Sequence, residues 1–152
     1  GDDILYANAG ATNVVDGGAG NDQLVGGWGN EQYHWGRGGG NDVIREVSGG
    51  GFDTLHIGAE VSADQIWLQR ASNDLVLSIV GTSDSLTLAD WYANDQARVE
   101  AVVLSSELSL QTAQVDALVA AMASFAPPAA GVSHLPESYQ SVLMPVIAVG
   151  WQ

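Results

Sequence analysis

A nine-residue pattern repeats through the first third of the chain and limits the folds that are open to it. The pattern is G-G-x-G-x-D-x-U-x, where U is a large apolar residue, and its clearest copy spans residues 17–25. The other copies keep the order glycine, acidic or amide residue, apolar residue: Gly1, Asp3 and Leu5; Gly10, Asn13 and Val15; Gly29, Glu31 and Tyr33; Gly40, Asp42 and Ile44; Gly51, Asp53 and Leu55. Glycine permits tight turns, and the residues around U form a short strand that buries U. Successive repeats are therefore expected to coil into stacked parallel strands.

The same spacing gathers oxygen atoms at the turns. Carbonyl groups of glycine turns and the adjacent carboxylates are hard ligands, and calcium takes about six to eight of them in irregular geometry. We therefore expect several Ca²⁺ ions. The candidate ligand residues are Gly1, Asp3, Asn8, Gly10, Asn13, Gly17, Gly18, Gly20, Asp22, Gly26, Gly27, Gly29, Glu31, Gly38, Gly40, Asp42, Gly49, Gly51 and Asp53.

Spacing also predicts how these residues are grouped. If two nonapeptides make one coil, equivalent turns lie about 18 residues apart. Asp3, Asp22 and Asp42 are then expected along one edge of the coil. Asn13, Glu31 and Asp53 are expected along the other edge, which is predicted to be less acidic and less regular. The alternatives are a glycine-rich linker, which lacks regular U positions, and a metal-free solenoid, which does not need acidic residues beside every turn.

The composition restricts the partners. The chain has 18 Asp and Glu residues against four Arg, and its net charge of −14 argues against nucleic acid as a partner. Cysteine is absent, so disulfides and thiolate sites are excluded. Calcium is expected to stabilise the fold in the way that disulfides stabilise other small domains. No N-terminal signal peptide is visible, and the chain begins within a repeat. We expect it to be the C-terminal piece of a longer protein, and a monomer.

Three segments are expected from the change in composition. Most of the 19 glycines lie in residues 1–58, which form the repeats. Residues 59–125 combine alternating apolar positions with one amphipathic helix near residues 112–126, and residues 126–152 read as a disordered tail or a docked strand. The predicted fold is therefore all-β: a parallel β-roll of calcium-binding nonapeptide repeats, capped by a small antiparallel sheet and one C-terminal helix.

The stretch SADQIWLQRASNDLVLSIVGTSDSLTLADWY, residues 62–92, resembles the segment that follows the repeats in haemolysin-type RTX (repeats-in-toxin) proteins. Its neighbours GRGGGNDVI, ARVEAVVL, QVDALVAAMASF and the closing AVGWQ are similar as well. The resemblance implies a module that is exported by type I secretion machinery, without an N-terminal signal peptide, and that folds on meeting calcium outside the cell. The export signal would lie within residues 126–152.

Other chemistry is weakly supported. His34 and His56 each follow an apolar residue on an expected strand and are read as strand or surface positions, and no His-Glu-x-x-His or Gly-x-Ser-x-Gly motif is present. We therefore expect no enzymatic activity. The remaining alternative is the surface-binding module of an RTX adhesin, which would contact a host surface through exposed aromatic side chains.

Overall fold

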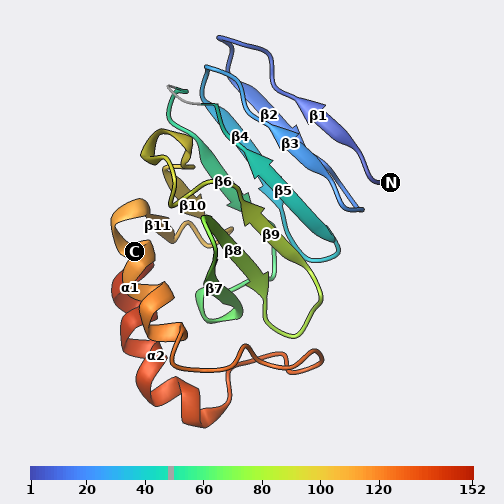
Figure 1. Cartoon of the computed structure of the whole chain (residues 1–152). Coiled ribbons are helices and arrows are strands. Elements are labelled where there is room, and N and C mark those ends of the chain that lie inside the picture. Colours follow the sequence, from blue (N-terminus) through green and yellow to red (C-terminus); the bar gives the residue numbers. More distant parts are fainter. Residues whose placement is uncertain (48–49) are drawn as a thin grey trace.

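The strands of the repeats alternate between two sheets that lie one over the other (Figure 1). The computed structural model describes residues 1–47 and 50–152. One sheet has the order β1-β3-β5-β9-β8-β7, and the other has the order β11-β10-β6-β4-β2. The strands are β1 (Ile4–Tyr6), β2 (Asn13–Asp16), β3 (Gln23–Val25), β4 (Glu31–Trp35), β5 (Asn41–Arg45), β6 (Thr54–Ile57), β7 (Ile66–Ala71), β8 (Asp74–Ile79), β9 (Ser85–Leu88), β10 (Ala101–Val103) and β11 (Ser109–Gln111).

The U residues of the repeats stack in register inside the molecule. Leu5, Leu24, Ile44 and Leu88 are consecutive lateral partners in the first sheet. Val15, Tyr33, Leu55 and Val102 are consecutive partners in the second sheet. All of them except the half-buried Leu5 are buried, so the apolar residue of each nonapeptide contributes to the core between the two sheets.

The predicted fold class is wrong, because the chain is not an all-β parallel roll. Both sheets mix parallel and antiparallel pairs, and two α-helices pack beside them. The residues predicted to form a separate capping sheet instead extend the sheets of the repeats. β9 pairs in parallel with β5 and antiparallel with β8, and β10 pairs in parallel with β6 and antiparallel with β11. The edges of β5 and β6 carry backbone groups that need partners, and β9 and β10 supply them.

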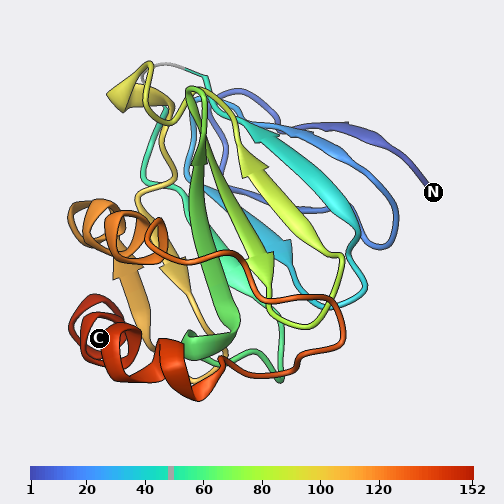
Figure 2. The same ribbon diagram turned by 60° about the horizontal axis from the view of Figure 1, so that its bottom comes forward.

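Two helices lie side by side at the end of the sheets that is remote from the N-terminus (Figures 1 and 2). α1 (Thr112–Met122) buries Val115, Leu118 and Met122, and agrees with the predicted amphipathic helix. α2 (Glu137–Gly150) lies in the segment that was predicted to be a disordered tail or a docked strand. Pro145 lies inside α2 on an exposed position. Proline removes one backbone hydrogen bond from a helix interior, so α2 depends on its packing against the rest of the molecule.

Residues from the repeats, from the middle segment and from the C-terminal segment share one hydrophobic cluster. Trp151 is buried and forms a bridge with Leu110 of β11, so the end of the chain is held against the second sheet. Two short 3₁₀ turns, η1 (Ala63–Gln65) and η2 (Asp95–Ala97), connect the elements of the middle segment. Among the described residues, no helix has both the length and the apolarity needed to cross a bilayer.

Candidate metal centre

One row of carboxylates runs along the edge of the coil where the second sheet leads into the first. The Asp22 carboxylate accepts the amide of Asp3 (2.7 Å), and the Asp42 carboxylate accepts the amide of Asp22 (2.8 Å). Asp84 ends this row, since its two carboxylate oxygens accept the amides of Gly40 (3.0 Å) and Gly38 (2.9 Å). We call Asp3, Asp22, Asp42 and Asp84 the first row. Its three repeat residues are those that the 18-residue spacing grouped together.

A second row follows the opposite edge. Asn13 donates its side-chain amide to Glu31 (3.0 Å), the Asp53 carboxylate accepts the amide of Glu31 (2.8 Å), and Glu100 accepts the amide of Asp53 (2.7 Å). We call Asn13, Glu31, Asp53 and Glu100 the second row. Glu100 was missed by the sequence reasoning. It directly precedes β10 as Asp53 directly precedes β6, and Ala101 is the register partner of Thr54, so an acidic residue before a strand was the signal.

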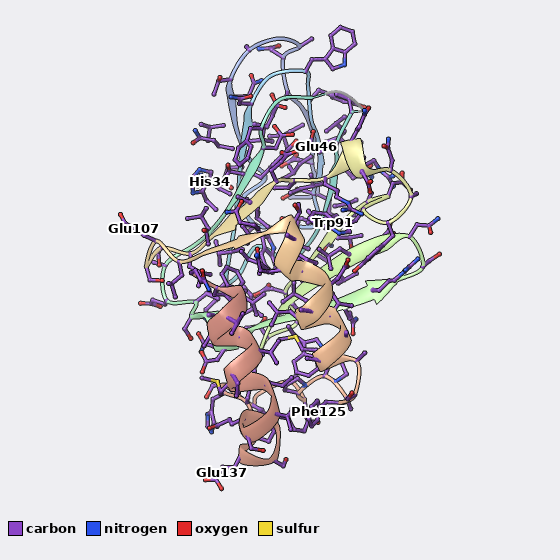
Figure 3. The ribbon with its side chains drawn as sticks, turned by 90° about the vertical axis from the view of Figure 1, so that its left-hand side faces the viewer. His34, Glu46, Trp91, Glu107, Phe125 and Glu137 are labelled. Atoms are coloured by element: carbon purple, nitrogen blue, oxygen red, sulfur yellow. The ribbon has the colours of Figure 1, made fainter. Side chains whose placement is uncertain are left out.

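Three carboxylates converge beside the second row. One ligand atom from each of Glu31, Glu46 and Asp53 lies within 4.8 Å of the others, which is the spacing of residues that can hold a metal ion. Glu46 lies outside the nonapeptide pattern and was not predicted. Asp42 and Ile44 are buried positions of β5, so the two-residue alternation of a strand also directs Glu46 inward. Figure 3 shows Glu46 between the two layers of strands.

The Glu46 side chain is in close contact with Tyr33 and with the turn at Gly26. The Tyr33 hydroxyl donates a hydrogen bond to Glu46 Oε1. A Cβ atom at Gly26 would collide with the Glu46 carboxylate and with the Tyr33 hydroxyl, so a larger residue there would displace one of these side chains. The amide of the buried Gly27 donates to Glu31 Oε2 (3.2 Å). The glycines of this turn therefore make room for the carboxylates and donate hydrogen bonds to them.

Burial and mutual repulsion raise the pKa values of this cluster. Burial raises the pKa of Glu46 to about 8; the hydrogen bond from Tyr33 works against this shift, and the negative charges of Asp53 and Glu31 add to it. Burial likewise raises the pKa of Asp53 to about 6, helped by the charges of Glu100 and Glu31 and opposed by the Glu31 amide. Burial raises the pKa of Asp42 as well. A cation at the cluster would favour the ionised carboxylates.

Two buried carboxylate oxygens, one in the first row and one beside the second row, lack a hydrogen-bond partner among the described residues. These atoms are Asp22 Oδ2 and Glu46 Oε2. Asp22 is only 1% exposed, and a Cβ atom at Gly17 would collide with its carboxylate. An unpaired buried carboxylate oxygen costs roughly 1–3 kcal/mol or more, unless a cation or a water molecule binds it. The donor set is all oxygen, which fits calcium.

The structure places the predicted ligand residues at the two edges. The first-row edge holds Gly1, Asp3, Gly17, Gly18, Gly20, Asp22, Gly38, Gly40 and Asp42. The second-row edge holds Asn8, Gly10, Asn13, Gly26, Gly27, Gly29, Glu31, Gly51 and Asp53. Gly49 lies outside the described residues. Gly10, Gly18, Gly20, Gly38 and Gly40 have positive φ, as tight glycine turns require. The role of these residues as calcium ligands stays a prediction.

The comparison with known families concerns the segment that closes both rows. Residues 74–106 match the family model described as Haemolysin-type calcium binding protein related domain. This stretch includes β9 and β10, which pair with the last repeat strands of each sheet, and it includes Asp84 and Glu100. Over these residues the chain is similar to the haemolysin-type calcium-binding proteins, which supports a relationship to the RTX-like family and indicates calcium binding.

Proposed function

We propose that this chain is the calcium-binding C-terminal module of a larger secreted RTX protein, in which the repeats fold around several Ca²⁺ ions. The observation that carries the proposal is the pair of carboxylate rows, with two buried carboxylate oxygens, one in the first row and one beside the second, that lack a hydrogen-bond partner among the described residues. The oxygens most directly available to a cation are Asp22 Oδ2 in the first row and Glu46 Oε2 beside the second row.

Folding and calcium binding are expected to be coupled. The chain carries a net charge of −14, and three of its carboxylates are held within 4.8 Å of one another. The charges that act on Glu46 from Asp53 and Glu31 are both negative, so ionisation of the cluster without a cation opposes folding. Each bound Ca²⁺ offsets two negative charges, and the free energy of binding thereby contributes to folding.

The module is proposed to act outside the cell. The likeness of residues 62–92 to the segment that follows the repeats in haemolysin-type RTX proteins favours export by type I secretion machinery, C-terminus first, with folding on contact with external calcium. The export signal is proposed to lie in residues 126–152. A low calcium concentration inside the cell would keep the repeats unfolded during export, because the carboxylates of each row repel one another when no cation neutralises them.

Circular dichroism in chelator and then in millimolar calcium tests the proposal. We expect strand signal to be lost in chelator at pH 8 and restored by calcium. Glu46→Gln should bind calcium at least about tenfold more weakly in an isothermal titration, since it removes one charge and one ligand oxygen. The matched control is Glu107→Gln, an exposed glutamate far from Glu46 (Figure 3). Spectra that are unchanged by chelator and by calcium would refute the proposal.

An adhesin-like surface module is the second candidate. Trp28 and Phe52 are exposed on neighbouring turns of the second-row edge, with 68% and 54% of their surface accessible. The amide of Phe52 donates to Asn30 Oδ1 (2.8 Å), which ties the two turns together. Two exposed aromatic side chains on linked turns favour a contact with a surface. Binding of the calcium-loaded chain to immobilised glycans, abolished in Trp28→Ala with Phe52→Ala, would support this role.

A further inference from the structure

A cavity of about 300 Å³ opens beside the C-terminal half of α2. Its walls come from η1, from the turn between β10 and β11, and from α2, which packs against η1. The apolar part of the lining consists of Leu108, Met144, Ile147, Ala148 and Trp151. Leu108 and Met144 are each 39% exposed, so part of this apolar lining faces solvent. Ligand sites are typically of this kind, mostly apolar with a small number of polar groups.

Asp64 of η1 is the one charged side chain in this lining. It is half-buried, and its Oδ1 atom accepts a hydrogen bond from the Ser62 hydroxyl group (2.5 Å). Among the described residues, no cationic side chain pairs with Asp64, and its Oδ2 atom accepts no hydrogen bond. A half-buried carboxylate beside an apolar wall is therefore available to a positively charged ligand.

A second cavity, of about 330 Å³, adjoins the first. The two cavities share the lining residues Ser62, Ala63 and Leu108, and we call them together the η1 groove. Glu60 is the one charged side chain in the lining of the second cavity. Arg37 donates to the Glu60 backbone carbonyl group (3.5 Å) and forms no ion pair with its carboxylate in the part of the chain that the structure describes. The η1 groove therefore carries two carboxylates and no cation of its own.

We propose that the η1 groove binds an amphipathic cation, a ligand with an apolar body and an ammonium group. The apolar body would contact Leu108, Met144 and Ile147, and its removal from water would favour binding. The ammonium group would pair with Asp64. Trp151 lines the same cavity, and indole is the aromatic ring that attracts a cation most strongly. A free alkylamine and a lysine side chain of an apolar peptide both present this chemistry.

Other classes of ligand fit the groove less well. A neutral apolar ligand would cover Asp64 without supplying an opposite charge, and an ionised carboxylate that loses water without a partner opposes binding. An anion is repelled by Asp64, by Glu60 and by the net charge of −14. A metal ion has too few ligands here, since three metal-ligating side chains converge, among the described residues, only at Glu31, Glu46 and Asp53.

The test uses the full chain saturated with millimolar calcium, so that the carboxylate rows are occupied and the groove is measured apart from the proposed calcium function. Three probes share one apolar body: hexylammonium, 1-hexanol and hexanoate. Two-dimensional NMR follows the indole N–H signal of Trp151 during each titration. We expect hexylammonium to bind about fivefold more tightly than hexanol, and hexanoate to bind more weakly than both. The peptide acetyl-Leu-Leu-Lys-amide is titrated in parallel, and the tighter of the two cations identifies the source of the ammonium group.

Asp64→Asn removes the charge and keeps an oxygen for the Ser62 hydroxyl group. It should lower hexylammonium affinity about fivefold and leave hexanol affinity unchanged, a difference that a merely structural role would not produce. Ala148→Phe, at an exposed position of α2, should fill the cavity and weaken binding of all three probes. Asp116→Asn and Val149→Phe are the matched controls, because both residues are exposed and line neither cavity.

Both control variants should bind hexylammonium as the unmodified chain does, and circular dichroism in calcium checks that every variant is folded. The proposal is overturned if neither hexylammonium nor the peptide shifts the Trp151 signal, or if hexanol binds as tightly as hexylammonium. It is also overturned if folded Asp64→Asn binds hexylammonium as tightly as the unmodified chain.

Discussion

The two carboxylate rows occupy equivalent places on opposite edges of the coil, yet they hold their charges differently. In the first row, the Asp22 and Asp42 carboxylates each accept the amide of the equivalent residue one coil earlier. In the second row, the longer Glu31 side chain meets Asp53 and also Glu46, and the three converge within 4.8 Å. Side-chain length and one residue outside the repeat therefore change a spaced row into a cluster.

The second edge was expected to be less acidic and less regular, and the difference lies in how its charges are arranged. Its carboxylates are Glu31, Glu46, Asp53 and Glu100, and three of them converge. Convergence has an energetic consequence, since burial and neighbouring charges raise the pKa of Glu46 to about 8 and that of Asp53 to about 6. The second edge should therefore respond to both protons and calcium.

Asp22→Ala should cause the largest loss of calcium affinity among single changes in the rows, about tenfold or more. Asp22 Oδ2 is buried and lacks a partner among the described residues, so it is free for a cation. Both oxygens of Glu31 already accept hydrogen bonds, from the Asn13 side chain and the Gly27 amide. Glu31→Ala should therefore lower calcium affinity less and thermal stability more.

Isothermal titration of both variants, together with thermal melts in saturating calcium, separates the two effects. Asp116→Ala is the control, because Asp116 is an exposed aspartate of α1 that belongs to neither row. Equal losses of calcium affinity in Asp22→Ala and Glu31→Ala would mean that the hydrogen-bonded oxygens of Glu31 also serve the ion.

The parts of the structure that follow the nine-residue period could be predicted from the sequence. Leu24, Ile44, Tyr33 and Leu55 stack as U residues because a period of two repeats per coil brings them into register. The grouping of Asp22 with Asp42, and of Glu31 with Asp53, follows from the same period. A repeat fixes its own neighbours, so these contacts need no knowledge of the rest of the chain.

The contacts between different segments could not be predicted in this way. The alternation after residue 64 identified strands, but periodicity does not reveal that β9 pairs with β5 and β10 with β6, which is why the predicted fold class is wrong. α2 was not predicted, because it is stabilised by packing on α1 rather than by local propensity. Glu46 and Glu100 were missed because neither belongs to the repeat.

Lowering the pH should refold part of the calcium-free chain. The raised pKa values mean that folded Glu46 and Asp53 keep protons that the unfolded chain has released by about pH 4–5. Their stabilising effect is complete below that pH and is lost as the pH rises through about 6 and then about 8. Strand signal lost in calcium-free buffer at pH 8 should therefore return in part at pH 5, as measured by circular dichroism.

Glu46→Gln sharpens this test, because glutamine imitates the protonated glutamate at every pH. The calcium-free variant should keep more strand signal at pH 8 than the unmodified chain, and its signal should change less between pH 8 and pH 6. Glu107→Gln should behave like the unmodified chain. A calcium-free signal that rises with pH would contradict the convergent arrangement of the second edge.

Tyr33→Phe should have the smallest effect and concerns the second edge alone. The Tyr33 hydroxyl donates to Glu46 Oε1, and this hydrogen bond works against the rise in the Glu46 pKa. Its loss should raise the Glu46 pKa further and weaken calcium binding at pH 7 by a few-fold, about 1 kcal/mol. Binding at pH 9 should recover in part, since a larger fraction of Glu46 is then ionised. Calcium titrations of Tyr33→Phe at both pH values, with the exposed Tyr6→Phe as the control, measure this difference. An equal loss at both pH values would show that Tyr33 acts on calcium binding by packing, and a loss in Tyr6→Phe would show that the effect is not specific to the cluster.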